Sequence, residues 1–336
     1  MNLLIVTQQA DRRDPILGFF HRWIEEFAAR CETVTVIAQG AGDFSFPKNV
    51  HVLSLGKEQS VPRIFQIVRF YLLLWKHRKA YDTVLVHMTP VWVVLGSPLF
   101  IILRKPVYLW YEIRRGGRML RCALRRVRKV FSATRDGLPF ASSKQVVTGH
   151  GIDTERFSPA TKDGEQHLLL TVGRLTRIKR HELFIRALAQ LPPPYRLVVA
   201  GGTITADDQV YLRELEILIH ELQLEGRVQI GFVPHEELPS LLRSCALYLH
   251  AAGGGLDKSL LEAMACGCAV LSASEASRNL LPASCQTTVD GFLEAVHTTL
   301  GRSLQERRTL TEDLRKRIVE GHSLPRLIER LIKEMA

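Results

Sequence analysis

Two segments of the chain combine residue types that suit an anionic, nucleotide-like ligand. Residues 172–179 read VGRLTRIK and place Arg174 and Lys179 on a loop just after a predicted strand. Residues 253–267 read GGGLDKSLLEAMACG and place a glycine-rich loop before a predicted helix that carries Glu262 about one turn inside. Arginine binds phosphate through two parallel hydrogen bonds, lysine binds it as a point charge, and a helix N-terminus offers free N–H groups. Because a carboxylate can also accept hydrogen bonds from ribose hydroxyls, the two segments predict a site for a nucleotide-linked donor.

The residues around these groups support that interpretation and leave simpler ones open. Gly173 allows a tight turn after the strand, and Asp257 is a suitable N-cap for the helix that follows. The simpler alternative for the first segment is a surface loop with incidental positive charge. For Glu262 the alternative is a solvated helix face, which fits poorly because apolar residues surround it in the sequence LLEAMA.

Length and composition describe a globular protein with two domains. A chain of 336 residues exceeds one ordinary core. The longest apolar stretch, residues 91–103, is too short to span a membrane, and the N-terminus enters a strand-like run without a basic leader. The six cysteines show no CxxC pair and no disulfide-like spacing, so we expect a reducing, cytoplasmic location.

Positive charge is concentrated in the first half of the chain. The formal net charge is +11, and residues 1–160 hold about twice as many basic as acidic side chains. The densest stretch, residues 114–135, suits anionic membrane headgroups or acidic substrates, although its arginines equally suit the solvated face of a core helix. Zinc-ligand spacing and an aromatic-and-basic signature are both missing, so nucleic acid is not an expected partner.

Alternating strand and helix patterns predict an α/β fold with parallel sheets. The pattern runs through residues 1–160 and then restarts, which predicts two Rossmann-like, doubly wound domains facing across a cleft. We place the domains at residues 1–160 and 161–322, followed by a last helix over 323–336. Residues 63–79 form an amphipathic helix whose apolar residues we expect to pack in the core, with a membrane-facing surface as the alternative. The predicted strands cover residues 3–7, 33–38, 50–55, 83–87, 107–111, 129–133, 145–147, 167–172, 196–200, 228–230, 247–250 and 269–272. The predicted helices cover residues 18–30, 63–79, 91–103, 118–128, 180–190, 210–222, 236–243, 259–266 and 324–335.

The chain resembles the retaining glycosyltransferases of family 4, which have the glycosyltransferase B fold. The strongest resemblance lies in VGRLTRIKRHELFIRAL, LVVAGG, RVQIGFVPHEELPSLL and GLDKSLLEAMACGCAVLSA, in the order and spacing of the family. DPILGFFHRWIEEFA, YDTVLVH and VVTGHGIDTERFSP match more loosely in the first half. The resemblance implies transfer of a sugar, without a metal, from a UDP- or GDP-sugar to a hydroxyl of a lipid-linked or saccharide acceptor. It further implies a role in cell-envelope or surface glycan and glycolipid assembly, in the cytoplasm or at the inner face of the cell membrane.

The resemblance also implies roles for individual residues. Arg174 and Lys179 would hold the donor diphosphate, Glu262 the ribose, and residues 231–234 the base. Gly18 would face the donor phosphates and the acceptor, and the last helix would pack back on the first domain. The remaining expected donor contacts are Gly173, Gly202, Phe232, Val233, Gly254, Gly255, Leu256, Lys258 and Ser259.

Two departures from the family pattern bear on activity. The family usually has a glutamate where this chain has Gly254, and we expect Asp257 to replace that acid as a catalytic residue. The family often has a histidine near the donor sugar where this chain has Glu112; His87 is the alternative sugar contact, and His150 precedes the linker between domains. The missing acid keeps two other functions open, a nucleotide-sugar-binding protein without transfer and a sugar-nucleotide epimerase.

Overall fold

The computed structural model describes residues 1–14, 16–114, 116–160 and 167–336. Within these residues the chain forms two compact units, Met1–Gly151 with His322–Ala336, and Ile152–Gly321. We expected the boundary at residue 160, in the polar stretch 157–165; residues 161–165 lie outside the described residues, as does Arg115 of the basic stretch. The division comes earlier in the chain because Ile152 and Phe157 are buried in the core of the second unit.

The first unit is built on a parallel sheet. In the described part of this unit, seven strands follow the order β3-β2-β1-β4-β5-β6-β7. Strands β2 and β3 lie on one side of β1, and β4 to β7 lie on its other side. The strand order therefore reverses between β1 and β4, which is the topological switch point of this sheet. The strands are β1 (Asn2–Ala10), β2 (Thr33–Ala41), β3 (Val50–Ser54), β4 (Thr83–His87), β5 (Val107–Trp110), β6 (Lys129–Ser132) and β7 (Gln145–Val147).

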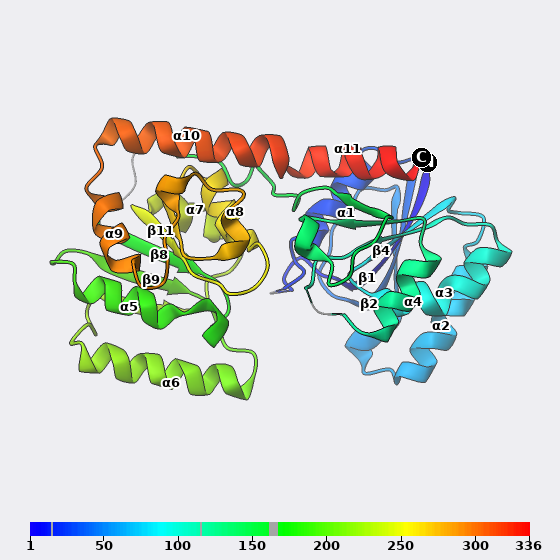
Figure 1. Cartoon of the computed structure of the whole chain (residues 1–336). Coiled ribbons are helices and arrows are strands. Elements are labelled where there is room, and N and C mark those ends of the chain that lie inside the picture. The colour runs from blue at the N-terminus through cyan, green and yellow to red at the C-terminus, as the bar shows by residue number, and fades with distance from the viewer. Residues whose placement is uncertain (15, 115, 161–166) are drawn as a thin grey trace. The chain divides into compact units, whose positions relative to one another are not determined.

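Helices cover both faces of this sheet because alternate strand residues point to opposite sides. Leu3 and Ile5 of β1 pack in one core with α1 (Phe20–Ala28) and α11 (Leu324–Met335), which lie side by side (Figure 1). Leu4 and Val6 pack in a second core on the other face. The helices of that second core are α2 (Arg63–Lys76), α3 (Pro90–Ile102) and α4 (Arg118–Arg126).

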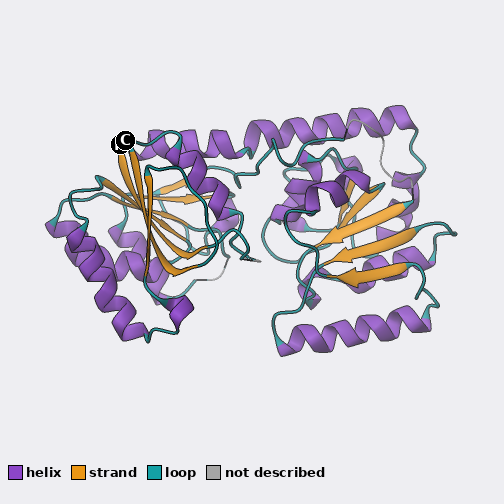
Figure 2. Ribbon diagram, turned by 180° about the vertical axis from the view of Figure 1, so that it is seen from behind, coloured by secondary structure: helices purple, strands orange, loops and turns teal. Residues whose placement is uncertain are grey.

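The second unit repeats this architecture with a smaller sheet. Its described strands follow the order β10-β9-β8-β11-β12, all parallel (Figure 2). The switch point lies between β8 and β11, so the loops that follow these two strands emerge next to each other. The strands are β8 (Leu168–Val172), β9 (Arg196–Ala200), β10 (Val228–Gly231), β11 (Leu247–His250) and β12 (Val270–Ser272).

Two cores again lie on opposite faces of the sheet. Leu168 and Leu170 of β8 pack with α7 (Leu238–Ser244), α8 (Lys258–Ala265) and α10 (Leu304–Gly321). Leu169 packs on the opposite face. The helices there are α5 (His181–Ala189), α6 (Ala206–Glu221) and α9 (Phe292–Leu300).

Two expectations about helices need correction. The helix α6 begins at Ala206 rather than residue 210 because Thr205 and Asp208 form a capping box. The predicted core packing of the α2 face is wrong for Ile64, Val68 and Leu72, which are 63%, 50% and 64% exposed. The expectation is confirmed for Ile67, which packs against the core together with Phe70, Leu73 and Leu74 of the same helix. Among the described residues, none of the helices combines the length and apolar character needed to cross a membrane.

Candidate functional site

The loop that carries Arg174 and Lys179 leaves β8 through a turn that requires glycine. Gly173 has a φ of +149°, a conformation that residues with a side chain rarely adopt. A Cβ at Gly201 would lie 1.9 Å from the carbonyl oxygen of Gly173, so the loops after β8 and β9 touch through their backbones. The short 3₁₀-helix η3 (Arg177–Lys179) then brings the lysine back toward the end of the strand.

The glycine-rich loop after β11 is joined directly to this first loop. The backbone N–H of Gly253 donates a hydrogen bond to the carbonyl oxygen of Ile178, at 3.0 Å. The hydroxyl of Ser259, in the first turn of α8, donates to the carbonyl oxygen of Val172 at 3.0 Å. A Cβ at Gly255 would meet no described atom within 4 Å. The structure therefore brings the two sequence motifs together and leaves space over the glycine loop.

Asp257 occupies the N-cap position of α8, but its side chain makes no capping hydrogen bond with the described backbone. Its carboxylate instead forms an ion pair with Lys179 and accepts a hydrogen bond of 2.9 Å from Nε2 of His250. Burial alone would raise the pKa of Asp257, but the bond to His250 and the charge of Lys179 hold that pKa well below its usual range. Asp257 is therefore ionised, and it binds the lysine that we expected to hold the diphosphate.

Arg174 lies on the other side of the loop and is more exposed. Its Nε atom is 3.7 Å from Oδ2 of Asp208, and its side chain is 46% exposed. Burial opposes ionisation of Asp208, but hydrogen bonds from the N–H groups of Ile204 and Thr205 lower the pKa of the carboxyl group. Since the guanidinium is only loosely held, much of its hydrogen-bonding capacity remains available to a ligand.

Glu262 is buried, contrary to the alternative of a solvated helix face. Its side chain is 5% exposed, and Oε1 lies 3.4 Å from Nε2 of His235 and 3.8 Å from Nζ of Lys258. Burial lowers the pKa of Lys258 to about 8, although the charge of Glu262 acts in the opposite direction. A buried carboxylate with two cationic or polar neighbours suits hydroxyl donors of a ligand such as ribose.

The residues expected to line the base lie on the loop after β10. Phe232 is 65% exposed, and a Cβ at Gly202 would lie 3.8 Å from its side chain. Val233 packs against the core of the second unit and anchors the loop. Leu256 is buried in the same core, and a Cβ at Gly254 would lie 3.8 Å from the side chain of Ile178. An exposed aromatic ring beside a glycine is a suitable platform for a planar base.

The other predicted residues belong to the first unit, so their relation to the donor residues stays a prediction. A Cβ at Gly18 would lie 2.7 Å from two backbone oxygens, which excludes any side chain there. His87 is buried at the end of β4 and stacks on Phe20, with 3.9 Å between ring centroids. The backbone N–H of His150 donates to Nδ1 of His322, at 3.3 Å.

Glu112 holds the backbone after β6. Its carboxylate accepts hydrogen bonds from the N–H groups of Ala133, at 2.6 Å, and Thr134, at 3.2 Å, and from the Thr134 hydroxyl, at 2.8 Å. Burial raises its pKa, although these hydrogen bonds oppose the shift. These contacts show a structural role for Glu112 in fixing the loop next to the strand end.

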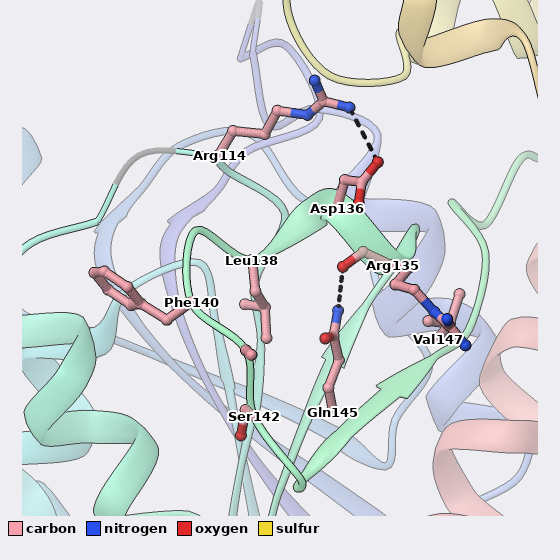
Figure 3. A pocket seen from close by; sticks show the side chains of 9 residues that line it. Arg114, Arg135, Asp136, Leu138, Phe140, Ser142, Gln145 and Val147 are labelled. Atoms are coloured by element: carbon pink, nitrogen blue, oxygen red, sulfur yellow. Dashed lines mark hydrogen bonds and ion pairs between the residues drawn. The ribbon is translucent and has the colours of Figure 1, made fainter.

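A cavity of about 690 Å³ lies in the first unit, beside β6 and β7 (Figure 3). Its polar walls include Arg114, which is 3.6 Å from Asp136, and Gln145, whose side chain donates to the carbonyl oxygen of Arg135 at 2.9 Å. Phe140 supplies an apolar wall (Figure 3). Sequence reasoning missed this cavity, although the basic stretch 114–135 contributes its two arginines.

Known proteins resemble this chain in fold, and a known family resembles part of its second unit in sequence. Residues 152–280 match the family model described as "Glycosyl transferases group 1". The second unit therefore resembles the group 1 glycosyltransferases over residues 152–280. HepE from Anabaena, solved in complex with UDP, superposes with a TM-score of 0.80 over 99% of both chains, at 18% sequence identity. Sucrose-phosphate synthase from Thermosynechococcus elongatus superposes with a TM-score of 0.76 over 99% of this chain and 98% of the other, at 16% identity. The α/β architecture with parallel sheets is thus that of the glycosyltransferase B fold, which confirms the predicted fold class.

Curated relatives match over shorter segments. The human GDP-Man:Man(3)GlcNAc(2)-PP-Dol alpha-1,2-mannosyltransferase is 31% identical over 116 residues, which are 32% of this chain and 24% of the relative. A Campylobacter jejuni N-acetylgalactosaminyltransferase, which acts on N-acetylgalactosamine-N,N'-diacetylbacillosaminyl-diphospho-undecaprenol, is 36% identical over 105 residues, which are 31% of this chain and 27% of the relative. This chain therefore spans about a quarter of the length of each of these relatives.

Proposed function

We propose that the protein is a retaining glycosyltransferase that moves a sugar from a nucleotide-diphosphate sugar to a hydroxyl acceptor. The observation that carries this proposal is the 3.0 Å hydrogen bond between Gly253 and Ile178, which joins the cationic loop to the glycine loop. This hydrogen bond holds the loop that carries Lys179 beside the N-terminus of α8. The free N–H groups there and the positive charge of Lys179 favour a diphosphate. The match of residues 152–280 to the family model of group 1 glycosyltransferases supports the same chemistry.

In the proposed reaction the protein positions the reactants and stabilises the leaving group. The acceptor oxygen forms a bond to the anomeric carbon while the bond from that carbon to the diphosphate oxygen breaks. Both events take place on the same face of the sugar, so the anomeric configuration is retained. The acceptor proton passes to the departing diphosphate, whose charge Arg174, Lys179 and the start of α8 stabilise without a metal.

For the donor we propose a UDP- or GDP-sugar. Glu262 would accept hydrogen bonds from the ribose hydroxyls, and the exposed ring of Phe232 would lie against the base. The donors in the names of similar proteins support this choice. HepE has been solved with UDP and with UDP-glucose, and the human relative is named for GDP-mannose.

For the acceptor we propose a lipid-linked saccharide, in the assembly of cell-envelope or surface glycans or glycolipids. The names of the two curated relatives contain a dolichol diphosphate and a diphospho-undecaprenol. The cavity in the first unit, with two arginines and the ring of Phe140 among its lining residues, suits an anionic and partly apolar acceptor (Figure 3). A saccharide without a lipid is the alternative acceptor, and it would bind without vesicles.

Contact with the inner face of the cell membrane would bring the first unit to such an acceptor. Five apolar side chains recur along one side of α2 and form an exposed surface, here called the α2 stripe: Ile64, Phe65, Val68, Leu72 and Trp75. Exposed basic side chains flank this stripe at Arg63, Arg69 and Lys76. A helix with this composition binds at the surface of anionic bilayers, because apolar side chains enter the headgroup boundary and basic ones bind the lipid charge.

A binding protein without transferase activity is the second candidate function. Gly254 stands where the related enzymes usually have an acid, and Asp257, the expected replacement, is already bound to Lys179 and His250. In that case nucleotide sugars would bind without release or transfer of the sugar. An epimerase, the third option, would interconvert the sugar of the donor when no acceptor is present.

A two-step experiment tests the proposal. Thermal-shift measurements with UDP-, GDP-, ADP- and dTDP-sugars first identify the donor without requiring the acceptor. The stabilising donor is then incubated with membrane extracts, and the anomeric configuration of the product is determined by NMR. The proposal requires a glycosylated product with the configuration of the donor. An inverted product would refute the retaining mechanism, and donor binding without turnover would favour the binding protein.

A further inference from the structure

A chain of hydrogen bonds connects the expected phosphate-binding lysine to a buried histidine at the end of β11. His250 is 4% exposed, and its Nε2 lies 2.9 Å from Oδ2 of Asp257, the same oxygen that binds Lys179. On its other side, Nδ1 of His250 lies 2.8 Å from Oγ of Ser272 at the end of β12. Lys179 therefore shares its counter-ion with the buried ring of His250.

The hydroxyl groups of Ser272 and Ser277, on the Nδ1 side of His250, can arrange their hydrogen bonds in two ways. Ser272 Oγ receives a hydrogen bond from the N–H of Ser274, at 3.1 Å, and lies 2.8 Å from Oγ of Ser277. Ser277 can donate to Ser272 or to the carbonyl oxygen of Ser274, at 2.8 Å. When Ser277 donates to Ser272, the Ser272 hydroxyl is free to donate to Nδ1 of a neutral His250. When Ser277 donates to the carbonyl oxygen of Ser274, Ser272 donates to Ser277 and accepts a hydrogen bond from the Nδ1–H group of a charged His250. The structure therefore accommodates both charge states without moving a heavy atom.

The ion pair between Lys179 and Asp257 competes with the proposed ligand. A diphosphate bound at the start of α8 attracts Lys179 away from Asp257, because it carries more negative charge than one carboxylate. Asp257, whose side chain is 21% exposed, would then be a partly buried anion whose main remaining partner is His250, and a neutral ring balances that charge poorly. Protonation of His250 restores the balance.

We propose that His250 is a positioning residue that takes up a proton when the donor diphosphate binds, so that Asp257 can release Lys179 to the phosphates. This inference rests on the proposed donor site and adds a residue that the sequence did not single out. The proton comes from solvent on binding and returns when the diphosphate leaves, so no net proton is consumed in a cycle.

The other titratable groups around this cluster do not take that proton near pH 7. Burial lowers the pKa of His181, at the start of α5, to about 4, and raises the pKa of Tyr248 of β11 far above neutrality. Both groups are therefore neutral with and without ligand. Lys258 has a pKa of about 8, so at pH 7.0 it is already mostly charged and can take up only about a tenth of a proton. Among the described titratable groups nearest to Asp257, His250 is the one whose hydrogen-bond partners, the hydroxyls of Ser272 and Ser277, fit both the neutral and the charged ring.

Calorimetry in buffers of different ionisation enthalpy tests the inference on the full-length chain. UDP-glucose and GDP-mannose serve as probes, because the diphosphate of a nucleotide sugar does not titrate near pH 7. The slope of the observed binding enthalpy against the ionisation enthalpy of the buffer gives the number of protons taken up. We expect an uptake of more than about 0.3 proton per nucleotide sugar in the wild-type protein at pH 7.0.

The matched variant His250→Gln keeps a donor for Asp257 and an acceptor for Ser272 but cannot be charged. We expect it to bind the probe at least tenfold more weakly and with an uptake of no more than about 0.1 proton. His167→Gln, at the opposite end of the sheet before β8, serves as the histidine control and should bind like the wild type. Binding by the wild type without proton uptake, or an unchanged uptake in His250→Gln, would overturn this inference and leave the proposed function intact. Failure of every nucleotide sugar to bind would refute the proposed function and this inference together.

Discussion

Replacement of Glu262 by glutamine should remove the preference of the protein for ribonucleotides. Glu262→Gln keeps the size of the side chain, but it replaces one carboxylate oxygen with a donor that cannot accept a ribose hydroxyl. A hydrogen bond to a charged group contributes about 1.5–3 kcal/mol, so the loss of one such bond weakens binding roughly 10- to 100-fold. The side chain is 5% exposed, so water can replace the missing interaction only in part.

The charge of the neighbouring Lys258 determines the pH at which this measurement should be made. Burial already lowers the pKa of Lys258 to about 8, and loss of the negative charge of Glu262 would lower it further. At pH 6.5, well below a pKa of about 8, Lys258 is protonated in the wild type, and this low pH also limits the loss of its charge in the variant. Titrations at this pH therefore report the lost ribose contact rather than a change in the charge of the lysine.

The assay compares UDP with 2′-deoxy-UDP, or GDP with 2′-deoxy-GDP, by isothermal titration calorimetry. The wild type should prefer the ribonucleotide by about tenfold or more, and Glu262→Gln should bind both forms with the same weak affinity. Glu216→Gln, on the exposed side of α6, is the matched control and should keep the preference. Equal binding of both forms by the wild type would refute the assignment of Glu262 to the ribose.

Three further predictions concern the leaving group, the membrane and the pH dependence of stability. Arg174→Ala and Lys179→Ala should each reduce kcat by about 10²–10³-fold, or 2.7–4 kcal/mol, in a transfer assay, and near-wild-type rates would remove both from the site. The double variant Leu72→Glu and Trp75→Glu should abolish pelleting with anionic vesicles at low salt while leaving donor binding unchanged; unchanged pelleting would exclude the α2 stripe. The free energy of unfolding should fall as pH decreases from 6.5 toward 4, because burial lowers the pKa of His181 and of His322 to about 4 whereas the unfolded value is 6.5; His181 should contribute up to about 3 kcal/mol of this fall. Urea titrations of His181→Phe should show a weaker dependence over that range, and the same dependence as the wild type would contradict this origin.

The sequence predicted the fold well because its signals were local and repeated. Strands such as β4 and β9 are short apolar runs between turn residues, and their predicted bounds agree with the structure. The approach of the two motifs also followed from the sequence, since loops after neighbouring parallel strands emerge at one edge of the sheet. Asp257 was correctly placed at the start of α8, but its partners were not predicted. They come from η3 and from β11, and their contact with Asp257 depends on tertiary packing.

Other features of the structure had no local signal in the sequence. The apolar residues of α2 have helical spacing, and spacing alone does not tell which of two apolar faces the sheet covers; Phe70 and Leu74 take that place. The role of Glu112 was equally hidden, because its hydrogen-bond donors belong to the loop after β6. In the sequence, His250 is a lone histidine at the end of a strand, and no neighbouring residue indicates a function for it. Its importance became visible only with Ser272 and Asp257 on its two sides.

The central claim is that residues 172–179 and 253–262 form one site for the diphosphate of a nucleotide sugar. Hydrogen–deuterium exchange of the full-length chain, with and without the nucleotide sugar that gives the largest thermal shift, tests this claim most directly. Exchange of backbone amides should slow in both segments together, because the ligand binds N–H groups of the glycine loop and holds the loop that carries Lys179. Unchanged exchange in both segments, with protection in the first unit around residues 135–147 instead, would contradict the claim.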